Sequence, residues 1–158
     1  MKEIPLTQGQ VALVDDEDYE WLNKYKWCAR WNKGTGSFYA LRKNKGKSES
    51  MHRDIMKPSK GLVVDHINHN TLDNRKSELR IVTHQQNIMN KSVHKNNSSG
   101  FAGVKWHKKN KSWISTIRFN YKDIYLGSFK LKCQAIKTRR NAEEKYFGEY
   151  AYKGDHHE

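Results

Sequence analysis

Short apolar runs separated by turn residues make up most of positions 1–60. Residues 11–14 (VALV) and 38–41 (FYAL) each predict a strand, because they are short, rich in β-branched or aromatic side chains and bounded by polar residues. Residues 33–36 (KGTG) predict the turn before the second strand. Asp15 follows the first strand and is a candidate cap for a short helix. We therefore expect residues 1–60 to form a small β-rich module.

The pattern in residues 61–92 predicts two strands followed by a helix. Residues 62–67 (LVVDHI) are apolar and β-branched, which predicts a buried strand that ends in two ionisable side chains. A polar loop then leads to a second strand near residues 79–82 (LRIV). Thr83 and Gln86 have the spacing of a capping box, which predicts the start of a helix. The expected order is strand, loop, strand, helix.

Beyond this segment the chain shows the period of two that is typical of antiparallel strands. Residues 93–100 have almost nothing to bury and predict a linker. Residues 101–150 predict three strands with one apolar face, formed by Val104, Trp106, Trp113, Ser115, Ile117, Phe119, Ile124 and Leu126. A last helix is expected to cover that face, because helical spacing relates Ala135, Arg139, Ala142 and Tyr146. Residues 151–158 are expected to be a tail. The predicted fold class is α+β.

The distribution of charge along the chain indicates a binding partner. The 158 residues carry a formal net charge of +13, and no acidic residue occurs between Glu78 and Asp123, where nine Lys and Arg alternate with aromatic residues. Such a region of a single sign favours binding to the phosphates of nucleic acid, although a merely soluble basic surface is the simpler alternative.

The sequence shows no membrane span and no secretory signal, so we expect a cytoplasmic protein. Cys28 and Cys133 lack the spacing of a disulfide framework or a cysteine metal site.

The residues with the clearest chemical potential follow the buried strand. Asp65 and His66 are followed by an Asn-rich loop and by a helix that carries His84 and Asn87. A carboxylate and an amide oxygen are suitable ligands for a hard divalent cation, and a histidine can accept the proton of an attacking water. Taken singly, Asp65 is equally consistent with a turn carboxylate and His66 with a buried structural imidazole. Neighbours on a strand point to opposite faces, so both can share a site only if the strand ends or bulges there.

These residues also carry a family resemblance. Residues 51–56 (MHRDIM) and 63–90 (VVDHINHNTLDNRKSELRIVTHQQNIMN) resemble the HNH endonucleases, particularly the phage and intron-encoded homing endonucleases, whose ββα-metal fold has the order predicted above. The resemblance implies that Asp65 and Asn87 are metal ligands, that His66 is the general base and that Asn74 orients the His66 imidazole.

The helical metal ligand is the point at which this sequence departs from the family name. Asn87 replaces the common helical histidine, and His84, one turn earlier, could compete with it. We favour Asn87 as the ligand, because an oxygen donor suits one Mg²⁺ or Mn²⁺ ion, whereas an imidazole would favour zinc or nickel. His52 is left unassigned, since it could flank the site or lie on a helix surface.

The C-terminal segment resembles a different family. The residues Gly103-Val104, Trp113 and Ile117-Arg118, with 125–129 (YLGSF), resemble the three-stranded DNA-binding domain of plant ethylene-response factors, which lays its sheet in the major groove. The resemblance implies that the DNA-reading side chains are Lys105, His107, Thr116, Arg118 and Tyr125. The lysines of the first turn are expected to contact phosphates, namely Lys108, Lys109 and Lys111.

Together these observations predict a site-directed DNA endonuclease. It would join an N-terminal DNA-contacting module (1–60), a ββα-metal catalytic unit (61–92), a linker (93–100) and a sheet-based DNA reader (101–150). We expect double-stranded DNA as the partner and a monomer, because no heptad or apolar stripe suggests a dimer. The alternative is a non-cleaving DNA-binding regulator with a degenerate nuclease unit.

Overall fold

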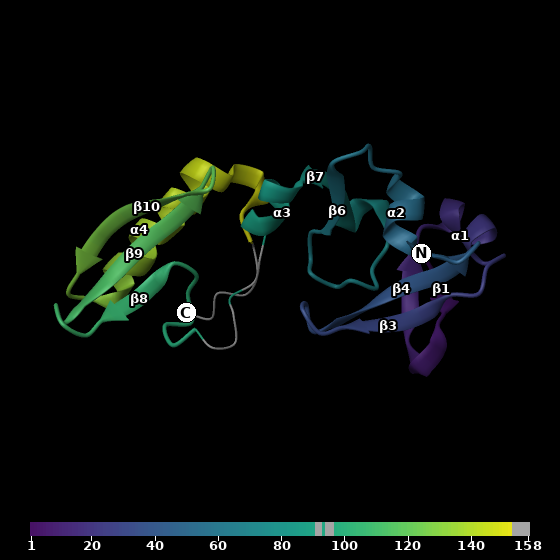
Figure 1. Ribbon diagram of the computed structural model, residues 1–158, viewed down its shortest axis with the longest axis horizontal. Coiled ribbons are helices and arrows are strands. Elements are labelled where there is room, and N and C mark those ends of the chain that lie inside the picture. The colour runs from purple at the N-terminus through teal and green to yellow at the C-terminus, as the bar shows by residue number, and fades with distance from the viewer. Residues whose placement is uncertain (91–92, 94–96, 153–158) are drawn as a thin grey trace. The chain divides into compact units, whose positions relative to one another are not determined.

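The computed structural model describes residues 1–90, 93 and 97–152. It divides into two compact units, Met1–His84 and Gln85–Glu158 (Figure 1). The described residues form four small antiparallel sheets and four α-helices, so the mixture of small sheets and short helices predicted from the sequence is present. Residues 94–96 of the expected linker and residues 153–158 of the expected tail lie outside the described residues. No described helix is long and apolar enough to cross a membrane.

The first unit contains three sheets. Strands β1 (Lys2–Pro5) and β2 (Val11–Val14) form a hairpin that encloses the 3₁₀ helix η1 (Thr7–Gly9). The second sheet has the order β3 (Cys28–Asn32), β4 (Ser37–Asn44) and β5 (Lys47–Ser50), and the expected turn joins its first two strands. The third sheet pairs β6 (Leu62–His66) with β7 (Leu79–Thr83), after the 3₁₀ helix η2 (Lys76–Glu78).

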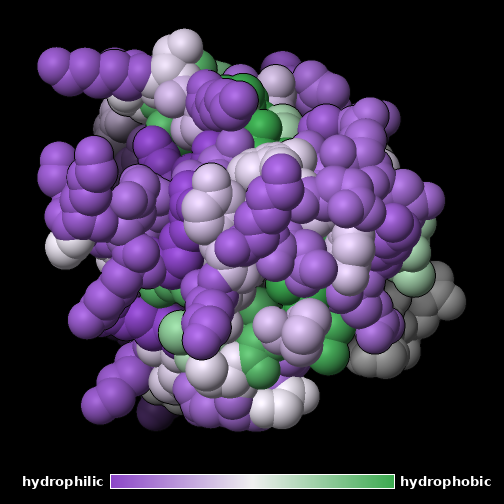
Figure 2. Space-filling view, turned by 90° about the vertical axis from the view of Figure 1, so that its right-hand side faces the viewer, coloured by the Kyte–Doolittle hydropathy of each residue, from purple (hydrophilic) through white to green (hydrophobic). Residues whose placement is uncertain are grey.

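Two helices and one core hold these sheets together. Helix α1 (Asp16–Leu22) starts after Asp15, as predicted, and α2 (Met51–Met56) follows β5 directly. Leu22 and Met51 are fully buried, and they share a core with Val14 of β2 and Leu79 of β7. Residues from 1–60 and from the following segment are therefore parts of one packed unit. The face seen in Figure 2 is mostly hydrophilic and shows hydrophobic residues only in small patches.

The second unit is a three-stranded sheet covered by a helix. Its strands are β8 (Val104–His107), β9 (Ser112–Phe119) and β10 (Lys122–Phe129), with β9 in the centre. Helix α4 (Lys132–Phe147) packs against one face of the sheet and leads into the 3₁₀ helix η3 (Gly148–Tyr150) (Figure 1). Helix α3 (His84–Met89) begins at the boundary between the units, and Met89 packs against the second core.

The covered face of this sheet follows the predicted alternation. Val104, Ser115 and Ile117 are buried beneath α4, where Ala135 and Ala142 lie close to the strands. The buried Arg139 of α4 donates from Nη1 to the backbone carbonyl oxygen of Thr116 (2.7 Å). Trp106 was expected on the covered face but is exposed, because it lies on the edge strand, which α4 covers least, where its ring contacts that of Trp113 edge-on.

Gly103 shows why the turn before β8 requires glycine. Its φ angle is 71°, in the left-handed region. A Cβ atom at this position would lie 2.2 Å from the backbone oxygen of Thr116. The close approach lets the Gly103 carbonyl accept the backbone N–H of Thr116 at 2.8 Å, which fixes the start of the sheet.

Candidate functional site

The predicted catalytic pair lies where β6 ends. Asp65 and His66 are both buried, and they are the last two residues of the strand. The backbone N–H of His69 donates to the carbonyl oxygen of His66 at 3.2 Å, so the chain turns directly after the pair. This is the strand end that the sequence analysis required before both side chains could serve one site.

Asp65 is balanced by a cross-strand arginine. Arg80 lies opposite Asp65 in the β6–β7 register. Its Nε and Nη2 atoms lie 2.9 and 2.8 Å from Oδ2 of the carboxylate. A carboxylate with so little solvent access requires a partner of opposite charge, because burial of an unpaired ion is costly. Arg80 thus fixes the orientation of the Asp65 side chain.

His66 lies in a cluster of rings from three elements. The ring centroid of His52, on α2, is 5.2 Å from that of His66, and the two rings meet edge to face. The Tyr39 ring, on β4, lies 6.2 Å from His66 and 5.9 Å from His52. Ser50 Oγ is 3.3 Å from Nε2 of His52. The structure therefore adds His52 and Tyr39 to the site, neither of which the sequence analysis assigned.

Both histidines are neutral near pH 7. Burial lowers the pKa of His66 to about 4, although the charge of Asp65 and a hydrogen bond with Asn74 act in the opposite direction. Burial lowers the pKa of His52 to about 3, and the neighbouring His66 contributes to this shift. A neutral imidazole can accept a proton, whereas an imidazolium cannot, so the environment keeps His66 in the state that a general base requires.

Asn74 is held by the backbone of the first hairpin. Its side chain is 1% exposed, and its amide nitrogen Nδ2 donates to the carbonyl oxygen of Leu72 (3.0 Å). The backbone N–H of Asn74 donates to the carbonyl of Leu13 (2.8 Å), and the N–H of Leu13 donates to the carbonyl of Leu72 (2.9 Å). The loop between β6 and β7 is thereby attached to β2, which places Asn74 firmly beside His66.

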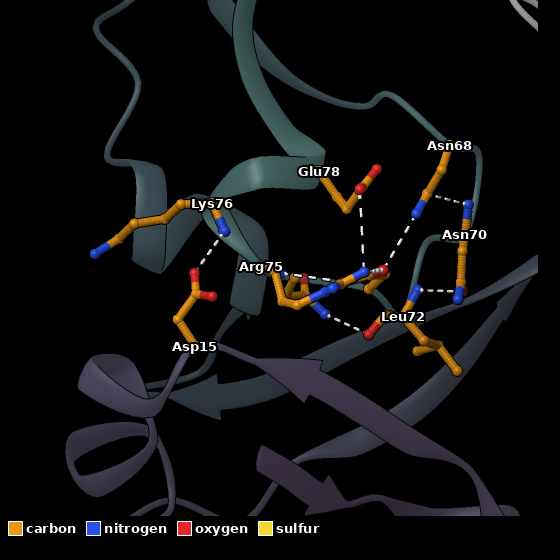
Figure 3. A network of polar contacts seen from close by, with 9 residues as sticks. Asp15, Asn68, Asn70, Leu72, Arg75, Lys76 and Glu78 are labelled. Carbon is orange, nitrogen blue, oxygen red and sulfur yellow. Dashed lines mark hydrogen bonds and ion pairs between the residues drawn. The ribbon is translucent and has the colours of Figure 1, made fainter. Parts of the chain in front are cut away.

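A second set of contacts stiffens the same loop (Figure 3). The buried Asp73 accepts from Nε and Nη2 of Arg75 at 2.8 and 2.6 Å and from Nδ2 of Asn68 at 3.1 Å. Hydrogen bonds from Arg75 lower the pKa of Asp73 below its usual value. At the far end of the loop, the backbone N–H of Lys76 donates to Oδ2 of Asp15 at 2.7 Å. Asp15 is the N-cap residue of α1, as predicted. Its side chain does not cap the helix, however, but accepts this hydrogen bond from the loop.

The candidate metal ligands are divided between the units. Asp65 belongs to the first unit, and His84 is its last residue, whereas Asn87 lies on the part of α3 that belongs to the second unit. Within the described residues, no group of three or more His, Cys, Asp and Glu side chains could hold a metal ion. The donor types nevertheless fit a hard cation, since a carboxylate and an amide oxygen are the ligands that Mg²⁺ and Mn²⁺ prefer.

The predicted DNA-reading residues lie on the face of the second sheet that α4 leaves open. Lys105, Arg118 and Tyr125 are exposed, and Arg118 has only a loose ion pair with Asp123 at 3.9 Å. Thr116 is half-buried, and its hydroxyl donates to the carbonyl oxygen of Gly103 at 3.3 Å. The open face is therefore basic and accessible, as the alternation predicted.

The turn between β8 and β9 adds further positive charge beside this face. Lys108, Lys109 and Lys111 are all exposed. His107 is half-buried, and its Nδ1 atom accepts the backbone N–H of Asn110 at 3.2 Å, which leaves Nε2 as the donor of the neutral ring. The turn therefore carries three accessible lysines beside the open face.

Comparison with known proteins supports the resemblance to HNH endonucleases. Residues 57–89 match the model of a family described as HNH endonuclease. The chain is 31% identical over 150 residues to a protein of Acanthamoeba polyphaga mimivirus named as an uncharacterised HNH endonuclease, and the match covers 91% of this chain and 74% of that protein. It is also 34% identical over 58 residues to Protein 3.8 of Escherichia phage T7, covering 37% of this chain and 48% of the phage protein. No solved structure matches the chain.

Proposed function

The chain belongs to the HNH endonuclease family, and we propose that it is a metal-dependent, homing-type endonuclease that hydrolyses phosphodiester bonds of double-stranded DNA at directed sites. The observation that carries this proposal is the buried, neutral His66 at the end of β6, next to Asp65 and beside the anchored Asn74. Buried ionisable groups with shifted pKa values are typical of catalytic sites.

In this proposal, His66 is the general base. It accepts a proton from the attacking water, whose oxygen forms the new bond to phosphorus while the bond to the 3′ oxygen breaks. The departing 3′ oxygen takes a proton from solvent, so the products are a 5′-phosphate and a 3′-hydroxyl. Asn74 is proposed to keep the imidazole oriented toward the water, because its loop holds it in a fixed position. The loop contacts to Leu13 make this orientation rigid before the substrate binds.

Asp65 and Asn87 are the proposed ligands of one Mg²⁺ or Mn²⁺ ion. When bound, such an ion would neutralise charge on the phosphoryl oxygens and assist the leaving oxygen. Nε and Nη2 of Arg80 both contact Oδ2 of Asp65, which orients the carboxylate. Arg80 is therefore a positioning residue in this proposal.

The open face of the second sheet is proposed to direct cleavage. Arg118 is the best candidate for reading base edges in the major groove, because it is an exposed arginine on the central strand of that sheet. The neighbouring residues Lys105, His107, Thr116 and Tyr125 would complete the reading surface. The three turn lysines would hold the duplex through phosphates, which fixes register without reading sequence.

A plasmid-nicking assay tests the proposed function most directly. Supercoiled DNA is incubated with the full chain and Mg²⁺ or Mn²⁺, and a chelator is added in a parallel reaction. We expect conversion to nicked or linear DNA with the metal and none with the chelator. DNA binding without cleavage under every metal condition would instead support the regulator alternative.

A further inference from the structure

A polar groove lies on the outer face of the β3–β4–β5 sheet in the first unit. It has a volume of about 420 Å³, and its polar lining comes from Arg30, Asn32, Lys33, Tyr39, Ser50 and His52. Arg30 and Tyr39 are cross-strand partners and project from the same face of the sheet. No carboxylate lines the groove among the residues that the structure describes.

Two residues of the groove lie next to the candidate active site. Tyr39 and His52 form one wall of it, and their rings lie 6.2 and 5.2 Å from the ring of His66. A polymer that lies in the groove would therefore pass the same two rings that surround the proposed general base.

The basic side chains of the groove are not neutralised by the protein. In the described part of the chain, neither Arg30 nor Lys33 forms an ion pair, and both are exposed. Arg42, which projects from the opposite face of the same sheet, is neutralised by carboxylates of the protein. Its guanidinium lies 2.9 Å from carboxylates of both Glu49 and Asp54 and stacks on the Tyr25 ring at 3.8 Å. Arg42 is a structural cation, whereas the groove cations remain available.

We propose that this groove binds the phosphate backbone of duplex DNA next to the scissile phosphate, with Arg30 and Lys33 contacting consecutive phosphates. The position next to the scissile phosphate rests on the proposed endonuclease function, whereas the binding of DNA in the groove does not. Two exposed cations, an acid-free lining and a wall shared with His66 are the features that a backbone-binding channel requires. The first unit thus positions the strand that it cuts, independently of the reading face on the second unit.

The test is the salt dependence of DNA binding by the full chain. Binding of a defined duplex is measured between low and moderate salt in the presence of a chelator, so that cleavage cannot interfere. The variant Arg30→Gln/Lys33→Gln removes two charges from the groove. The matched control is Lys24→Gln/Lys26→Gln, which removes two charges from exposed lysines of the same unit that do not line the groove. Arg30→Lys keeps the charge in place.

We expect the groove variant to reduce the slope of log affinity against log salt by about 0.9 for each lost phosphate contact, hence by nearly two in total. The control double variant and Arg30→Lys should keep the wild-type slope. With metal added, the groove variant should also raise the KM for DNA cleavage. Circular dichroism confirms that each variant is folded, which is expected because all four residues are exposed.

The outcomes separate the two proposals. An unchanged slope in the groove variant, or an equal reduction in the control, overturns the groove proposal even if the wild type cleaves DNA. A reduced slope only in the groove variant, together with no cleavage by any form, supports the groove and overturns the endonuclease. A wild type that neither binds nor cleaves DNA overturns both.

Discussion

At the scale of single residues, His66 carries the proposed chemistry, and its environment sets its protonation state. Burial keeps the imidazole neutral, while Asp65 and Asn74 limit how far its pKa falls. The balance matters because a base whose pKa is too low accepts a proton weakly. Each of these residues therefore has a distinct expected effect when it is replaced.

The first prediction concerns His66. His66→Ala should reduce the cleavage rate by about 10²–10⁴-fold, the usual contribution of a general base, and should leave DNA affinity unchanged. Both quantities are measured on the same duplex, with the metal chelated for the binding assay. A parallel loss of affinity would show that His66 has a structural role, which contradicts the proposed mechanism.

The second prediction concerns the metal ligands. Asp65→Ala and Asn87→Ala should each raise the metal concentration needed for half-maximal cleavage, with Asp65 the more damaging because it supplies the charged ligand. His84→Ala is the matched comparison on the same helix and should have a smaller effect. If His84→Ala is as harmful as Asp65→Ala while Asn87→Ala is nearly silent, His84 is the helical ligand.

The third prediction is a loss of stability in mild acid. His52 and His66 have pKa values of about 3 and 4 in the folded protein, below the ordinary value near 6.5. Between these values the unfolded chain binds more protons, so the free energy of unfolding should decrease as the pH falls below about 6.5. The decrease should approach about 1 kcal/mol per pH unit for each histidine.

Urea unfolding at pH 7.5, 6.5, 5.5 and 5.0 measures this effect. His52→Gln should show a weaker dependence than the wild type, because one of the two buried imidazoles is gone. Equal stability at pH 7.5 and 5.0 would show that neither histidine is buried in its neutral form.

At the scale of secondary-structure elements, the loop between β6 and β7 is the part that makes the site rigid. It contains no regular structure before η2, but backbone hydrogen bonds attach it to Leu13, and side-chain contacts tie Asp73 to Arg75 and Lys76 to Asp15. A loop that is fixed at several points loses little further entropy when substrate binds. Asn74 is therefore held in place for its proposed role.

The fourth prediction tests this attachment. Asp73→Asn should remove the charge that binds Arg75 and should reduce the free energy of unfolding by about 2 kcal/mol or more, because Asp73 is buried. It should also slow cleavage at saturating metal, since Asn74 loses its support. Asp16→Asn, at an exposed carboxylate of the same unit, should cost much less stability, because exposed ion pairs are screened by solvent. Equal effects of the two substitutions, measured by urea unfolding, would contradict the proposed role of the loop.

At the scale of the whole molecule, the protein is made of two compact units with separate cores. The sequence predicted a boundary at residues 93–100, and part of that segment lies outside the described residues. The compact units instead divide between His84 and Gln85, and Met89 of α3 packs against the second core. The helix that carries Asn87 thus belongs mainly to the unit with the proposed reading face.

The fifth prediction distinguishes base recognition from phosphate binding on the open face of the second sheet. Arg118→Ala should relax sequence preference at one position and cost about 1–3 kcal/mol of binding to the preferred site. Lys109→Ala should weaken binding to all sequences alike and reduce the salt slope by about 0.9. Binding to a preferred duplex and to a scrambled duplex measures both effects. If both variants lose affinity uniformly, Arg118 contacts phosphate and the specificity lies elsewhere.

The sequence alone determined the local elements and the residues that are close along the chain. The strand end at Asp65 and His66, the start of α1 after Asp15 and the open and covered faces of the second sheet all follow from hydrophobic periodicity and turn chemistry. These features depend on neighbours within a few residues, which a single sequence shows directly.

Only the tertiary structure decided which distant residues meet. It placed His52 and Tyr39 against His66, Leu13 against the β6–β7 loop and Arg80 against Asp65, and it opened the groove of Arg30 and Lys33 beside them. No periodicity encodes these contacts, because each depends on how separate elements pack into one core. The protonation state of His66 also follows from this packing, since burial by distant elements, and not its neighbours in sequence, is the largest cause of its lowered pKa.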